Sequence, residues 1–124
     1  GDINITPNGT GKINLDNANL KTFNEVVYAI GTTSGTITPD FANGSIQTIT
    51  LNGNMTFSSI TGIAAGKSFT LIVSQDGTGS RTLTSTMKFA GGSKTLSTDP
   101  NAIDVISVFY DGTNYYASLT VGYA

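Results

Sequence analysis

Cysteine, histidine and tryptophan are all absent from the 124-residue sequence. Without Cys or His, the chain has no disulfide, no zinc site of the usual Cys/His kind, no cysteine nucleophile and no Ser-His-Asp triad. Charge is also scarce, because only 11% of the residues are charged and the formal net charge is -2. The six basic residues stand singly along the chain, with no basic patch to neutralise a row of phosphates, so we expect no nucleic-acid binding.

Long apolar runs are missing as well. No run approaches the roughly 18 apolar residues of a membrane-spanning helix, so we expect no membrane insertion. No signal peptide is recognisable at the start of the sequence. Because the chain begins with Gly1 rather than Met, we expect it to be a C-terminal fragment of a longer protein.

Small polar residues take the place of the missing charges, with 20 Thr, 15 Gly, 12 Ser and 11 Asn. Threonine favours strands because its branched Cβ suits a pleated surface, whereas Gly, Asn and Ser favour turns. Strand-like segments recur about every ten residues without an amphipathic helix between them. They span residues 26–31, 36–38, 45–51, 68–75, 81–84, 102–110 and 115–121.

Turn-forming sequences separate these segments and predict hairpins. Asn52-Gly53-Asn54 is expected to reverse the chain, so that Met55 and Phe57 lie on a return strand. Residues 81–84 are expected to run back along 68–75, and Gly91-Gly92 to close a small hairpin. The apolar run 102–110 is expected to be buried on both faces. The pattern favours an all-β fold, an antiparallel sandwich or barrel.

Three stretches of the sequence resemble a known family: "NGNMTFSSITGIAAGKSFTLIVSQDGTGSRTLT", "KFAGG" and "NAIDVISVFYDGTNYYASL". They are similar to the C-terminal domain of tailed-bacteriophage fibre and virion structural proteins, notably of marine phages. The opening "ITPNGTGKINLD" resembles a repeat found along such fibres. The resemblance covers 45–124 well and 1–16 moderately. Ser85-Thr86 stands where family members often carry Trp-Pro.

The resemblance implies a homotrimeric, non-enzymatic virion component at the distal end of a tail or capsid fibre. It therefore implies an extracellular virion location and, as partners, further copies of the chain and other virion proteins. On this basis we expect a fibre-repeat stalk at 1–22. A jelly-roll-like antiparallel β-sandwich tip is expected at 23–124.

The opening sequence nearly repeats itself, with "GDINI" followed ten residues later by "GKINL". Two such short strands cannot bury an apolar face alone. In a trimer, three copies would direct four apolar residues toward a common axis, in the manner of a solenoid. These trimer-axis residues are Ile3, Ile5, Ile13 and Leu15. The alternative is that the two segments pair with an edge of the main domain.

Catalysis and metal binding have little support in the sequence. Most of the eight carboxylates lie in expected turns, where Asp bonds its own backbone, so we expect no enzyme and no cofactor. The Asp76 and Asp111 turns offer oxygens to calcium, but an Asp-Gly turn explains both. Asp104 is an isolated carboxylate inside an apolar run. It could face a subunit interface, occupy an edge position or pair with a Lys or Arg, and we favour the ion pair because a lone buried carboxylate is costly.

A glycan site needs an aromatic platform with amides and carboxylates nearby. One loop offers all three, and its candidate contacts are Tyr110, Asp111, Asn114, Tyr115 and Tyr116. The alternative is a cross-strand aromatic pair that closes the hairpin. The favoured function is attachment to a bacterial surface glycan or protein. The alternatives are an architectural trimerisation, cap or capsid-decoration domain, and an adhesin module.

Overall fold

The computed structural model describes all 124 residues and contains one seven-stranded sheet with two short 3-10 turns. The all-β prediction is confirmed. The structure contains no candidate membrane-spanning helix. The strands are β1 (Val27–Thr36), β2 (Ile46–Thr56), β3 (Lys67–Gln75), β4 (Leu83–Thr84), β5 (Lys88–Phe89), β6 (Ile103–Tyr110) and β7 (Tyr115–Tyr123), and the 3-10 turns are η1 (Phe41–Asn43) and η2 (Ala90–Gly92).

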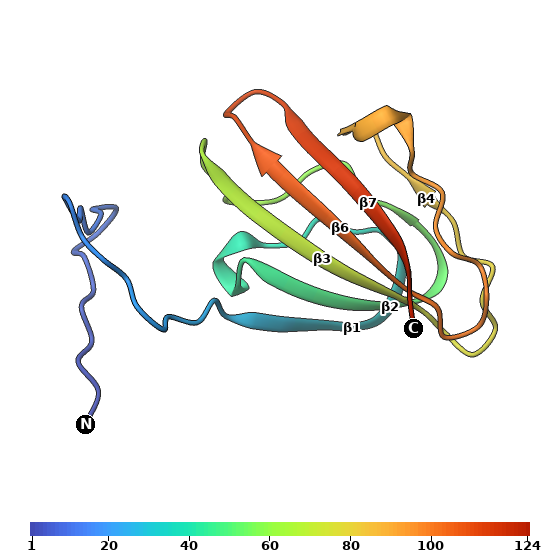
Figure 1. The fold of residues 1–124 in the computed structure, drawn as a ribbon, viewed down its shortest axis with the longest axis horizontal. Helices are drawn as coiled ribbons and strands as arrows, with labels where there is room; N and C mark the ends of the chain where they lie inside the picture. Colours follow the sequence, from blue (N-terminus) through green and yellow to red (C-terminus); the bar gives the residue numbers. More distant parts are fainter.

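The sheet is mixed, so the prediction of a purely antiparallel sheet was wrong. The strand order is β1-β2-β3-β6-β7-β5, in which β1, β2 and β3 are parallel neighbours. Only the β3–β6 and β6–β7 pairs are antiparallel. The reason is that the connections 37–45 and 57–66 return the chain to the starting end of the sheet instead of reversing it (Figure 1).

Residues 83–89 connect β2 with β7, two strands that are not neighbours in the sheet. Their first part, β4, pairs with β2, and their last part, β5, pairs with β7. Between these pairings the side chains alternate, with Leu83, Ser85, Met87 and Phe89 buried and the residues between them exposed. The sheet therefore curls around one hydrophobic core. The core residues are Ile37, Ile49, Leu51, Met55, Phe57, Ile60, Phe69, Leu71, Val73, Leu83, Met87, Phe89, Leu96, Ile106, Val108 and Ala117.

The expected reversal at Asn52-Gly53-Asn54 is absent, because β2 continues through it to Thr56. Residues 52–54 instead form a bulge, since the β1–β2 register passes from Thr33↔Leu51 directly to Gly35↔Met55. A Cβ on Gly53 would lie 2.8 Å from the Ser34 Oγ, so glycine permits the close approach of β1.

Two further expected hairpins were wrong. Residues 81–84 do not run back along β3, because β4 lies parallel to β2 at Met55 and Thr56. The residues around Gly91-Gly92 form no hairpin, since β5 pairs with β7 and η2 follows it directly. Both errors have one cause: these segments pair with strands remote in the sequence, which local turn signals do not report.

The β6–β7 hairpin is confirmed, with Tyr110 paired to Tyr115 across the turn. However, β6 is buried on one face only. Ile106 and Val108 lie in the core, whereas Phe109 on the other face is 45% exposed. The apolar run was therefore misread as a strand covered on both sides.

Asp104 is buried but contacts no Lys or Arg, so the expected ion pair was wrong. Its Oδ2 accepts a hydrogen bond from the Ser97 backbone N–H at 2.7 Å. Its Oδ1 accepts from the Ser97 hydroxyl at 2.8 Å and from the Gly122 backbone N–H at 3.0 Å. Three donors replace the missing cation, and together they tie β7 and the segment before β6 to the start of β6.

Residues 1–26 form no strand, and only the last of them bonds to the sheet, where the Ile46 N–H donates to the Val26 carbonyl at 3.5 Å. Figure 1 shows the first part of this segment extending away from the curled sheet. Its apolar side chains are exposed: Ile3 by 90%, Ile5 by 70%, Ile13 by 46% and Leu15 by 62%. The single chain thus leaves the four residues of the predicted stalk without an apolar partner, and the stalk remains a prediction.

We predict that Gly79→Ala destabilises the fold by at least about 2 kcal/mol. Gly79 has φ +74°, and a Cβ there would lie 2.5 Å from the Thr98 carbonyl oxygen. Gly77→Ala in the same turn is the matched control, because a Cβ there meets nothing within 4 Å. Urea unfolding measures both variants, and equal stabilities would contradict this packing of the turn.

Candidate functional site

The two ends of the sheet differ in their position relative to the N-terminal segment. We call the end that this segment enters the near end, and the opposite end the far end. At the near end, β1, β2 and β3 begin and the β6–β7 turn lies beside Lys67, which pairs with Tyr110. At the far end, β3 ends at Gln75, and Ile103 pairs with Tyr123 close to the C-terminus. The chain comes from residues 1–26 into the near end, so the far end points away from the predicted stalk (Figure 1).

The predicted contact loop lies at the near end, and two of its tyrosines serve the hairpin itself. The rings of Tyr110 and Tyr115 stack with centroids 4.5 Å apart. The Tyr110 hydroxyl donates to the Gly112 carbonyl at 3.0 Å, and the Tyr115 hydroxyl accepts from the Ile60 N–H at 3.2 Å. The structure thus contains the cross-strand aromatic pair that the sequence offered as the alternative.

Asp111 organises the turn between these tyrosines. Its Oδ1 accepts from the N–H groups of Asn114 at 2.7 Å and Thr113 at 2.8 Å. These two bonds hold the pKa of the Asp111 carboxyl below its usual 3.8, with a smaller contribution from the Tyr116 hydroxyl. The carboxylate is therefore engaged as a turn former, as the Asp-Gly interpretation predicts.

Tyr116 lies on the opposite face of β7 and does not join the other two tyrosines. It pairs with Phe109 on the outer face of the sheet, and both rings are nearly half exposed. The two rings border a shallow hollow of about 480 Å³. Four hydroxyl residues of three neighbouring strands line the same hollow: Ser68, Thr70, Ser107 and Ser118. We call it the aromatic hollow.

At the far end, the buried amide of Gln75 joins two loops that are distant in the sequence. Its Nε2 donates to the carbonyl oxygens of Arg81 and Ser97, both at 2.9 Å. Its Oε1 accepts from the Arg81 N–H at 3.0 Å. The Ser80 N–H adds a 2.7 Å bond to the Thr98 carbonyl. Residues 80–82 and 95–98 are therefore fixed against each other.

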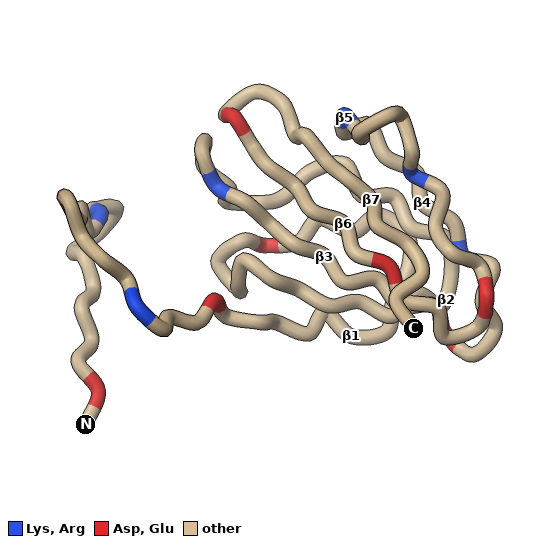
Figure 2. The backbone as a smooth tube through the Cα atoms, in the orientation of Figure 1, with Lys and Arg blue, Asp and Glu red and all other residues tan.

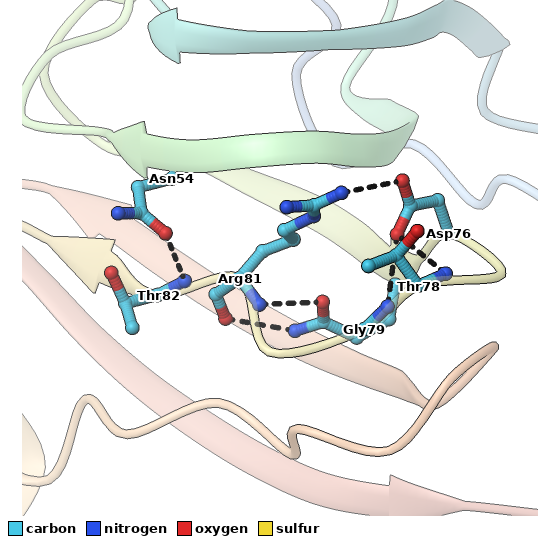
Figure 3. A network of polar contacts seen from close by, with 7 residues as sticks. Asn54, Asp76, Thr78, Gly79, Arg81 and Thr82 are labelled. Carbon is cyan, nitrogen blue, oxygen red and sulfur yellow. Dashed lines mark hydrogen bonds and ion pairs between the residues drawn. The ribbon is translucent and has the colours of Figure 1, made fainter.

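The Arg81 side chain extends along this loop to Asp76 (Figure 3). The guanidinium Nη2 lies 3.0 Å from Asp76 Oδ2, and both side chains are about one fifth exposed. Asp76 Oδ1 also accepts from the N–H groups of Thr78 and Gly79. The bond from Arg81, followed by that from Gly79, lowers the pKa of the Asp76 carboxyl below 3.8.

A second hollow, of about 280 Å³, lies between the two joined loops. We call it the basic hollow, because two of its lining residues are Arg81 and Lys94. Figure 2 shows basic positions beside β4 and β5, on the side away from the N-terminal segment, with acidic positions nearby. The other lining residues are Thr82, Leu83, Thr95, Leu96 and Thr98.

The basic hollow was not predicted, because Arg81 and Lys94 are isolated cations in the sequence. The Gln75 bonds bring their loops together, and an internal Gln in a strand gives no local signal of its partners. Lys94 is also fixed, since its Nζ donates to the Ser85 carbonyl at 2.7 Å. No group of three or more Asp, Glu, His or Cys residues is placed to hold a metal ion.

Comparison with known proteins gives one family. Residues 37–115 match the family model described as "Putative phage tail fibre C-terminal domain". Neither the curated proteins nor the solved structures include a match. The matched residues run from the connection after β1 to the first residue of β7, and they include both loops that border the basic hollow.

We predict that Asp76→Asn/Asp111→Asn lessens the loss of stability in acid. Both native carboxyls have pKa values below 3.8. Their stabilisation is therefore complete above the unfolded pKa and disappears as the pH falls through the lower folded pKa. Urea midpoints from about pH 5 to about pH 2 should fall less steeply for the double variant than for the native chain. Asp2→Asn/Asp16→Asn is the matched control, because it removes the same number of negative charges from the N-terminal segment. Identical slopes for all three proteins would contradict the prediction.

Proposed function

The chain belongs to the family of phage tail fibre C-terminal domains, and from this premise we propose that it is the distal, host-attaching part of a homotrimeric fibre. Family membership makes it a virion component with a structural role in the fibre. Attachment, trimerisation and extracellular exposure are our proposals beyond this. The family match over 37–115 is the observation that carries them.

The exposed apolar residues of the N-terminal segment support the trimer. Four of them recur at the spacing of the two near-repeats, and the single chain buries none of them. A solenoid-like stalk of three chains would remove this apolar surface from water, at roughly 25 cal/mol per Å² buried. We therefore assign residues 1–22 to the stalk and 23–124 to the tip.

The aromatic hollow supports attachment to a surface glycan. An exposed aromatic ring offers an apolar face to a sugar, and the four surrounding hydroxyls can exchange hydrogen bonds with its hydroxyl groups. Of the five predicted contacts, Tyr116 is the one whose ring borders this hollow. Three tips on one fibre would gain avidity without tight binding at each.

A purely architectural role is the second candidate, and the outer face of the sheet favours it. The outward positions of β2, β3, β6 and β7 carry no charged side chain, which suits contact with another virion protein. These positions are Ile46, Thr48, Thr50, Ser68, Thr70, Ile72, Ser74, Ile103, Val105, Ser107, Phe109, Tyr116, Ser118 and Thr120. Such a domain would trimerise or cap the fibre without binding cells.

We predict a solution mass of three times 12.8 kDa for the 124-residue chain by light scattering. Ile3→Asp/Ile13→Asp should lower this mass to that of one chain, because three copies of each aspartate would meet at the stalk axis. Asn4→Asp/Asn14→Asp is the matched control, since these neighbours alternate to the outside of an extended segment. A native chain that stays monomeric would exclude the intertwined stalk.

Adsorption to host cells separates the two candidate functions. A labelled native trimer should bind host cells, and Tyr116→Ala should bind several-fold less while keeping its mass. A trimer that binds no cells would support the architectural role and contradict attachment.

A further inference from the structure

We propose that the basic hollow binds an anionic group, a carboxylate or a phosphate, carried by a sugar of the bacterial surface. This inference rests on the proposed attachment function but concerns a different surface from the aromatic hollow. It assigns to Arg81 and Lys94 a role that their isolated positions in the sequence do not suggest.

Charge is the first support. Of the five hollows in the fold, this is the one lined by two basic residues. Asp76 pairs with Arg81 and neutralises one of the two positive charges. One positive charge therefore remains in a protein of net charge -2, which favours an anion over a neutral or cationic group.

Unused donors are the second support. Within the chain, the Arg81 guanidinium makes one hydrogen bond, from Nη2 to Asp76, although it carries five N–H donors. Its Nε also has no partner, but this atom is buried and does not count among the donors that a ligand can reach. The Lys94 ammonium uses one of its three donors on the Ser85 carbonyl. Guanidinium and ammonium donors make their strongest hydrogen bonds to carboxylates and phosphates.

The site is also built before any ligand arrives. Gln75 bonds the backbone of Arg81 on one side of the hollow and the backbone of Ser97 on the other. The close packing of Gly79 under Thr98 fixes the same two loops. Two cations held in place cost less ordering entropy on binding than two mobile side chains would.

The remaining lining residues suit a sugar. Three threonines, Thr82, Thr95 and Thr98, surround the cations, and hydroxyls can both donate to and accept from sugar hydroxyls. A volume of about 280 Å³ is at the small end of ligand sites, so it suits one sugar residue of a longer chain. The hollow lies at the far end of the sheet, the end that a fibre would present to a cell.

The test is an amide NMR titration of the full chain with D-glucuronic acid and, separately, D-glucose, which share one ring and differ in the oxidation of C6. We expect the acid to shift the amides of Thr82, Thr95 and Thr98, and glucose to leave them in place. Added salt should weaken the effect. D-glucose 6-phosphate distinguishes a phosphate from a carboxylate preference.

Lys94→Gln should weaken binding of the preferred anion by about tenfold or more. Lys88→Gln is the matched control, because it removes the same charge at a residue that lies outside the basic hollow. Equal shifts with glucose, no shifts with either anion, or unchanged binding by Lys94→Gln would each overturn the proposal.

Cell adsorption separates this inference from the function on which it rests. If the native trimer binds host cells and Lys94→Gln binds them equally, the anionic site is wrong and attachment stands. If both anions shift the hollow but no host cell is bound, the site stands and attachment is wrong.

Discussion

The bonds of the Gln75 amide hold together the two loops that form the basic hollow. This buried side chain satisfies both its donor and its acceptor on the backbones of Arg81 and Ser97. A buried amide without partners would cost about 1–3 kcal/mol, so the two loops are held where those partners lie. The Asp104 carboxylate acts in the same way one strand further along, with Ser97 and Gly122 as its donors. Two buried polar groups thereby order the whole far end in a chain without disulfides.

The curled sheet explains how so small a chain forms a core. Residues 83–89 contact β2 at one end and β7 at the other, and their buried side chains complete the apolar interior. The same arrangement places the hydroxyl-rich residues of β2, β3, β6 and β7 on the outside. The surface consequently offers two chemically distinct areas. One is the uncharged face with the aromatic hollow, and the other is the far end, where the basic hollow contains Arg81 and Lys94. The first suits protein or neutral sugar contact, and the second suits an anion.

The sequence predicts the parts of the fold whose partners are local. The alternation in 68–75 and the Asp-Gly turn at 111–112 predict β3 and the β6–β7 hairpin, and all three strands are present. Parallel pairing of β1, β2 and β3 was not predicted. Turn residues show where a strand ends, but they do not determine at which end of the sheet the next strand begins. Asn52-Gly53 carries the same signal for a reversal as for a bulge, and only the neighbouring β1 decides between them. Likewise, Tyr110 and Tyr116 are close in sequence but lie on opposite faces of the sheet. Arg81 and Lys94 line one hollow because Gln75 joins the backbone of Arg81 to that of Ser97.

We propose that the far end of the sheet lies at the outermost point of the fibre. Ala124 is exposed, and the C-terminal strand ends at that end of the sheet. A gold-binding peptide fused after Ala124 would therefore mark this end on intact virions in electron micrographs. We expect gold at the outermost tips of the fibres, in groups of up to three. Gold along the shaft, or where the fibre joins the virion, would contradict it.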